Sequence, residues 1–137
     1  MQNLEQFRAH NALDRAPVCR KASGEGDCLS GFPSLIVNNG LLAALAYSIE
    51  KSTKKDGSLD RRKQWINIAD SIAFHLHEMQ IAQRPGSRTD ALWLRSFLAG
   101  CTPDTQNRDA DSFVLRRATD EALAFLTYLK RFAKSAD

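Results

Sequence analysis

The sequence is poor in the residues that build special scaffolds. Its 137 residues include only 7 glycines, 4 prolines and 3 cysteines. Collagen-like chains and disulfide-stapled scaffolds need many more of these residues, and a hydrophobic fraction of 43% excludes a disordered chain. The cysteines are odd in number and form no CxxC motif, so we expect reduced thiols in a cytosol.

Long hydrophobic segments are also missing. The longest apolar run extends from Leu41 to Tyr47, whereas a membrane-spanning helix needs about 20 apolar residues. The first residues, Met1 to Glu5, have neither the basic nor the apolar part of a signal peptide. We therefore expect a cytoplasmic protein that does not contact membranes. Its length predicts a single domain over residues 1–137.

Apolar residues recur at helical spacing in five segments, and none of the chain shows the alternation of a β-strand. The pattern predicts helices at residues 2–16, 33–51, 59–79, 89–99 and 112–134. The last helix is the clearest, because its apolar residues fall on one face over more than five turns. The spacing predicts an all-α fold, a compact bundle of five to six helices, with a flexible loop at residues 100–111.

Some details of these helices can also be predicted. The first helix has a weak apolar stripe, formed by Leu4, Ala9, Ala12, Leu13 and Ala16. Ser58 is expected to cap the third helix, and Ser87 with Asp90 has the spacing of a capping box before the fourth.

The segment 33–51 is apolar on nearly every side. A helix of this kind must be covered all round, so it is either the central helix or presents one face to another subunit. Gly40 inside it costs about 1 kcal/mol relative to alanine, and we expect the close approach of a neighbouring backbone to offset that cost. Asn38, Asn39 and Gly40 are thus the candidate residues for subunit contact or tight packing.

No motif indicates catalysis. The glycines form neither a P-loop nor a GxGxxG motif, and no GxSxG elbow is present. Only His75, His77 and Glu78 could suggest a metal-dependent hydrolase. The two histidines point about 200° apart on a helix, and His75 with Glu78 alone does not make a site. We therefore expect a partly exposed helix face, with no catalytic residue, metal site or cofactor.

Basic residues gather on the first and last helices. In the last helix they lie opposite the apolar stripe, and in the first helix Arg8 and Arg15 share a face. These are either ordinary solvated faces or a phosphate-binding strip that is neutral to sequence. No zinc-finger, helix-turn-helix or RNA-binding strand motif accompanies them, so base-specific recognition is not expected. The candidate phosphate contacts are Arg8, Arg15, Arg116, Lys130, Arg131 and Lys134.

Three segments also carry a resemblance. The first is Leu4-Glu5-Gln6 with Arg8, Ala9 and Ala12; the second is Phe32-Pro33-Ser34-Leu35-Ile36 followed by Asn39-Gly40-Leu41-Leu42; and the third runs from Arg116-Arg117-Ala118-Thr119 to Lys130-Arg131-Phe132-Ala133. Together and in this order they resemble the small helical subunit of the type III-B (Cmr) CRISPR effector complex. Residues 52–111 match nothing specific in that family.

The resemblance implies an all-helical, non-catalytic subunit without a cofactor. Its implied partners are the other subunits of the Cmr complex, copies of itself stacked in a minor filament, and the guide and target RNA. The six candidate basic residues would then line the RNA path. A helical adaptor with no nucleic-acid role explains the helices equally well and stays open as the alternative.

Overall fold

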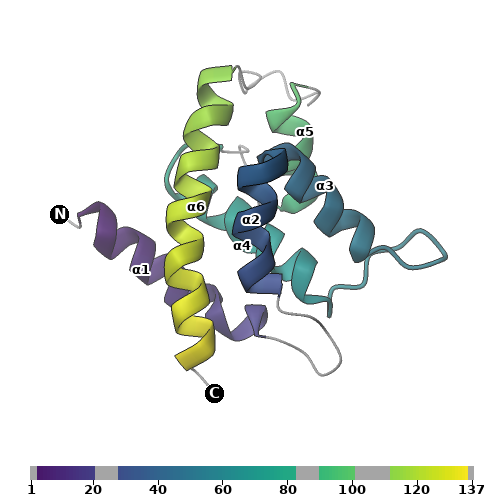
Figure 1. The fold of residues 1–137 in the computed structure, drawn as a ribbon, viewed down its shortest axis with the longest axis horizontal. Helices are drawn as coiled ribbons and strands as arrows, with labels where there is room; N and C mark the ends of the chain where they lie inside the picture. The colour runs from purple at the N-terminus through teal and green to yellow at the C-terminus, as the bar shows by residue number, and fades with distance from the viewer. Residues whose placement is uncertain (1–2, 21–27, 83–89, 101–111, 136–137) are drawn as a thin grey trace.

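The computed structural model describes residues 3–20, 28–82, 90–100 and 112–135, with side chains up to residue 133. Within these ranges the regular elements are all helices, and the Thr53–Leu59 pair is an isolated bridge outside any strand. The all-α prediction is confirmed. The predicted flexible loop, apart from Gly100, lies outside the described residues. The elements are α1 (Leu4–Arg15), the 3-10 helix η1 (Ala16–Cys19), α2 (Cys28–Asn39), α3 (Leu41–Lys51), α4 (Gln64–Glu78), α5 (Ala91–Leu98) and α6 (Ser112–Ser135) (Figure 1).

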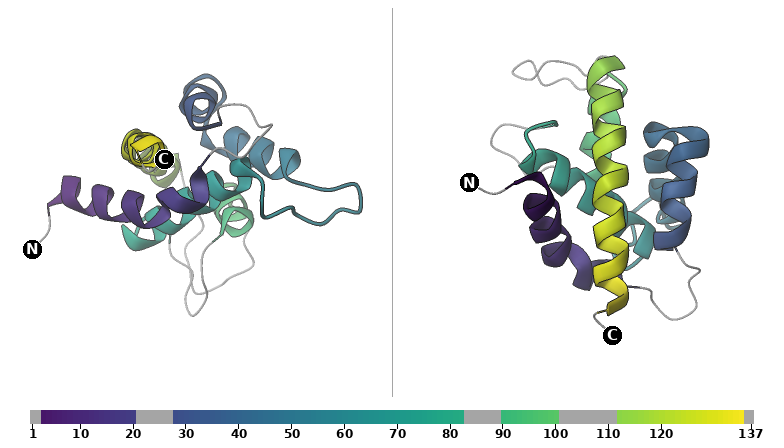
Figure 2. Two further views of the ribbon diagram at one scale, coloured as in Figure 1. Left: turned by 90° about the horizontal axis from the view of Figure 1, so that it is seen from below. Right: turned by 60° about the vertical axis from the view of Figure 1, so that its left-hand side comes forward.

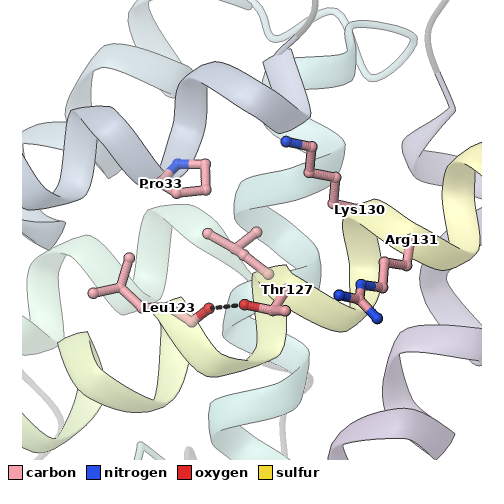
Figure 3. Close-up of a pocket in the computed structure, with 6 residues that line it drawn as sticks. Pro33, Leu123, Thr127, Lys130 and Arg131 are labelled. Atoms are coloured by element: carbon pink, nitrogen blue, oxygen red, sulfur yellow. Dashed lines mark hydrogen bonds between the residues drawn. The ribbon is translucent and has the colours of Figure 1, made fainter.

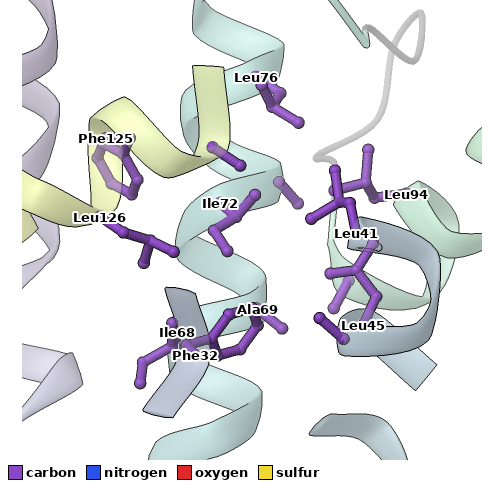
Figure 4. Packing of buried hydrophobic residues seen from close by; sticks show 14 of the residues in the cluster. Phe32, Leu41, Leu45, Ile68, Ala69, Ile72, Leu76, Leu94, Phe125 and Leu126 are labelled. Carbon is purple, nitrogen blue, oxygen red and sulfur yellow. The ribbon is translucent and has the colours of Figure 1, made fainter. Parts of the chain in front are cut away.

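The centre of the bundle is α4. It contacts every other helix of the described ranges, and its side chains Ile68, Ile72 and Leu76 are fully buried. Figure 4 shows these side chains with α3 on one side and α6 on the other, where Phe125 packs against them. The segment 33–51 is therefore not the central helix, and that expectation is wrong.

The same segment is two helices rather than one. The chain turns at Gly40, which has φ 94° and ψ 159° and precedes α3 as its N-cap. This backbone region is accessible essentially to glycine alone. A Cβ on Gly40 would meet no atom within 4 Å, so close packing against a neighbouring backbone does not explain this glycine. Because α2 and α3 each bury their own face, the segment looks apolar all round when it is counted as a single helix.

Three predicted helix starts also differ from the structure. The helix predicted to begin at residue 33 begins at Cys28, and Pro33 lies inside it. Ser58 does not cap α4, because its backbone N–H and hydroxyl donate to the Asp56 carboxylate at 2.9 and 2.6 Å in the preceding loop. The cap of α5 is Asp90, which accepts from the backbone N–H of Trp93 at 2.9 Å. Ser87 lies outside the described residues.

Asp70 connects α5 to the central helix. Its carboxylate accepts the backbone N–H of Ala91, the first residue of α5, at 2.9 Å, and it also pairs with Arg61. Burial raises the pKa of Asp70, although both of these partners act against the increase. None of the helices in the described part of the chain is long and apolar enough to cross a membrane.

The conformation at Gly40 can be tested by substitution. Gly40→Ala should lower the free energy of unfolding by about 1–3 kcal/mol, because alanine is strained at this positive φ. Gly31→Ala is the matched control. Gly31 lies inside α2, and a Cβ there would sit 3.8 Å from Trp65, at ordinary contact distance. The control should be neutral or stabilise the fold by up to about 1 kcal/mol. Urea unfolding of both variants measures the difference, and equal effects would contradict the assigned turn.

Candidate nucleic-acid interface

The longest helix, α6, presents one face to the outside of the bundle. Its 24 residues extend for about 36 Å. In Figure 2, α1 lies on one side of it and α2 on the other, and both pack against it. The buried face consists of Ala118, Ala122, Phe125, Leu126, Leu129 and Ala133. The predicted apolar stripe of the last helix is thus confirmed in its central part. The opposite half of the helix faces away from the bundle.

Four cations occupy this outward half. Arg116, Arg117 and Arg131 are exposed, and Lys130 is partly buried. We call these four residues the outer basic face. Within the described residues, none of the four forms an ion pair. Arg116, Lys130 and Arg131 were predicted from the sequence as phosphate contacts, whereas the position of Arg117 beside them is seen only in the structure. The side chain of Lys134 is outside the described part of the chain.

Two hollows open along the outer basic face. One has a volume of about 530 Å³ and lies between α6 and Pro33 of α2, with an apolar floor from Leu123 and Leu126. Figure 3 shows Lys130 and Arg131 at its border, with their charged ends pointing in different directions from α6. The other hollow measures about 300 Å³ and is lined by Arg8, Phe113, Arg116, Arg117, Asp120 and Glu121.

Arg8 does not belong to the outer basic face, because it is neutralised by a neighbour. Its Nε and Nη2 donate to the two carboxylate oxygens of Glu121 at 2.7 and 2.8 Å. This bidentate arrangement is the strongest geometry for an arginine–carboxylate pair. The expectation that Arg8 projects from the bundle together with the cations of α6 is therefore wrong.

Glu121 is held by a second partner, His75. The ring is entirely buried, and its Nε2 lies 2.9 Å from Glu121 Oε2 while Nδ1 lies 2.9 Å from the Asn11 amide nitrogen. With the amide assigned in this orientation, Asn11 donates to Nδ1, so the neutral ring carries its proton on Nε2 and donates to Glu121. Phe125 stacks on the ring at 4.4 Å between centroids.

The predicted partly exposed face is confirmed for His77 and Glu78, which are partly and fully exposed, but it is wrong for His75, whose two ring nitrogens are engaged inside the protein. In the described part of the chain, no group of three histidine, cysteine or acidic residues could hold a metal ion. Cys19 and Cys28 are both buried, and Cys101 is outside the described ranges. Burial raises the pKa of the Cys19 thiol to about 11, so this thiol is protonated at neutral pH.

Arg15 also faces the interior. Its Nε donates to the Ser71 hydroxyl at 2.9 Å, and its guanidinium carbon lies 5.9 Å from the centre of the Phe74 ring. Leu13, on the opposite side of α1, is 58% exposed, and Leu4, the first residue of the helix, is 47% exposed, although both were expected in the apolar stripe. The basic side of α1 is therefore its packed side, and Arg8 reaches the hollow lined by Arg116 and Arg117 as the partner of Glu121. Phosphate contacts of Arg8 and Arg15 stay a prediction.

The candidate interface residues next to Gly40 lie on the surface. Asn38 and Asn39 are exposed at the end of α2, and the neighbouring Val37 is 71% exposed. The turn at Gly40 therefore leaves a small corner with one apolar and two amide side chains. Its role in subunit contact stays a prediction.

The buried carboxylate should make the protein sensitive to acid. Burial by itself raises the pKa of Glu121, but hydrogen bonds from Arg8 and His75 outweigh it and lower the pKa to about 2 from an ordinary 4.5. A group whose pKa falls on folding stabilises the fold above its unfolded pKa and loses this contribution as the pH decreases. For Glu121 that contribution is on the order of 3 kcal/mol, and it should disappear between about pH 4.5 and pH 2.

Glu121→Gln measures this contribution. Urea unfolding at pH 7 should show a loss on the order of 3 kcal/mol, and the gap to the parent protein should narrow below pH 4.5. Glu50→Gln, at an exposed position of α3, is the matched control and should change little. A gap that stays constant from pH 7 to pH 3 would contradict the assigned charge state.

Comparison with known families identifies the family of the chain. The family model described as CRISPR-associated protein (Cas_Cmr5) matches residues 4–136. No curated protein and no solved structure gives a match to the chain. The family match spans all the described helices, including α4 and α5, where the sequence by itself showed no specific resemblance. The chain therefore belongs to the Cmr5 family of CRISPR-associated proteins, the small subunit of the type III-B system, whose partners are the other subunits of the Cmr complex.

Proposed function

We propose that this subunit has no catalytic role and guides RNA along the outer basic face of α6 within the Cmr complex. The observation that carries the proposal is the placement of the four cations on one side of a single helix, without ion pairs to the described carboxylates. Cations that lack a protein counter-charge are available to phosphates. Each phosphate contact releases condensed counterions, and this favours binding without regard to base sequence.

The rigidity of α6 supports the same role. The helix is anchored by its buried stripe and by the Arg8–Glu121 pair, so the outer cations start from a fixed backbone. Preorganised donors lose less conformational entropy on binding than donors on a loop do. Arginine, which supplies three of the four cations, also matches the geometry of phosphate with its planar fork.

Stacking of copies is the second part of the proposal. We place the contact between copies at the corner formed by Val37, Asn38 and Asn39, because it combines an exposed apolar side chain with two amides. Successive copies would form a minor filament beside the subunits that hold the guide RNA, in the cytoplasm. A few phosphate contacts per copy are weak, and a row of copies multiplies them through effective concentration.

A helical adaptor without RNA contact is the competing function. The hollow of about 530 Å³ favours it, because Pro33, Leu123 and Leu126 offer an apolar floor that suits a protein side chain. An adaptor would bind its partner through that floor, and the neighbouring cations would form the rim. Binding of RNA should then be insensitive to the charge of α6.

Charge reversal separates the two functions. Complexes assembled with Arg116→Glu/Arg117→Glu or with Lys130→Glu/Arg131→Glu should bind target RNA more weakly, to a similar degree for different guide–target pairs. The slope of log affinity against log salt should fall by about 0.7 for each single-strand phosphate contact that is lost. Filter binding at several salt concentrations measures both quantities.

Lys54→Glu/Lys55→Glu is the matched control. It changes the charge by the same amount on the exposed loop between α3 and α4, which Figure 1 shows far from α6. The control complex should bind as the parent complex does. If all three variants retain the affinity and salt slope of the parent, the RNA path does not follow α6 and the adaptor function is favoured.

A further inference from the structure

The most exposed aromatic side chain in the described part of the chain is Phe113, at the start of α6. It is 71% exposed, whereas the other markedly exposed aromatic residue, Tyr47, is 37% exposed. Burial of a phenylalanine side chain stabilises a fold, so the exposure of Phe113 gives up a favourable contribution to the stability. Phe113 also falls outside the apolar stripe that begins at Leu115 and therefore faces the same side as the outer cations.

Phe113 has two arginines as its nearest neighbours along the helix surface. Arg116 and Arg117 follow it by three and four residues, the spacings that bring side chains together on one side of a helix. All three line the hollow of about 300 Å³, together with the Arg8–Glu121 pair and Asp120. The charges of Arg8 and Glu121 cancel each other, so the two outer arginines exceed Asp120 by one positive charge.

A flat apolar ring beside two guanidinium groups matches the two parts of a nucleotide. The ring offers a stacking surface for a base, and the guanidinium groups offer donors for its phosphates. Stacking of this kind tolerates any base and strengthens binding in proteins that bind single strands. A base inside a duplex has both faces covered by its neighbours, so a stacking residue selects an unpaired nucleotide.

We infer that Phe113 stacks on the base of an unpaired RNA nucleotide while Arg116 and Arg117 bind the adjacent phosphates. The inference rests on the proposed RNA contact of α6 and adds the class of ligand, single-stranded and without base preference. A protein side chain that covers Phe113 is the competing occupant. It would use the apolar area of the residue but not its aromatic plane.

The test uses the full chain and two short strands. NMR titration at low salt compares a uridylate hexanucleotide with an abasic hexamer that carries the same phosphates. Phe113→Leu keeps the apolar side chain but removes the aromatic plane, and Phe113→Trp restores it. Phe113→Leu should weaken binding of the uridylate strand at least about fivefold, leave binding of the abasic strand unchanged, and be rescued by Phe113→Trp. Arg116→Glu/Arg117→Glu should weaken both strands.

The other outcomes overturn the inference in different ways. If Phe113→Leu binds the uridylate strand as the parent does, while the arginine variant loses both strands, stacking is absent and the phosphate contact remains. If the parent chain binds neither strand, the site does not exist on a single subunit, and the function proposed for the assembled complex is still decided by its own charge reversals. If Phe113→Ser retains the uridylate strand but no longer assembles with the other Cmr subunits, the residue is a protein contact.

Discussion

A single buried negative charge sets the arrangement of three helices. Glu121 lies on the inner flank of α6 and is only 7% exposed, where an unpaired carboxylate would be very costly. The compensation comes from α1 through Arg8 and from α4 through His75. A buried pair of this kind is costly to break, because removal of either partner leaves an uncompensated charge inside the protein. The rotation of α1 and of α6 about their own axes follows from this requirement.

The rotation of α6 in turn decides where its other charges lie. With Glu121 directed inward beside α1, the apolar stripe is seated on α4, and the opposite half of the helix is left for Arg116, Arg117 and Arg131. The same constraint takes Arg8 out of the cationic surface and turns the basic side of α1 to the interior. The outer basic face of α6 is therefore a product of the buried network, and a change at Glu121 would affect both.

The sequence allowed the fold class, the approximate helix positions and the family to be predicted. The first two depend on local periodicity, and the family depends on three segments whose residues resemble it. The inward position of Arg8 could not be predicted in the same way, since its partner Glu121 is 113 residues away. A signal was present, however: Glu121 adjoins the apolar stripe of the last helix, and a carboxylate there needs a counter-charge. The break at Gly40 was missed because apolar residues resume directly after Asn38-Asn39-Gly40, although the Asn-Gly pair and the cost of an internal glycine both pointed to a turn.

The candidate site was predicted in part. The prediction placed Arg8 and Arg15 on the outside of the bundle because it considered each helix by itself. An arginine on a helix surface is solvated or packed according to what the next helix brings to it, and one helix does not contain that information. Phe113 is the opposite case, because it is apolar and yet lies on the outer side of α6. The apolar stripe, which begins at Leu115, gives no reason for a phenylalanine there. In the proposed function, phosphate contacts and base stacking share one property: neither depends on the base sequence of the RNA. This property suits a subunit of an RNA-guided complex, where base pairing with the guide reads the target and protein contacts to the backbone hold it in place.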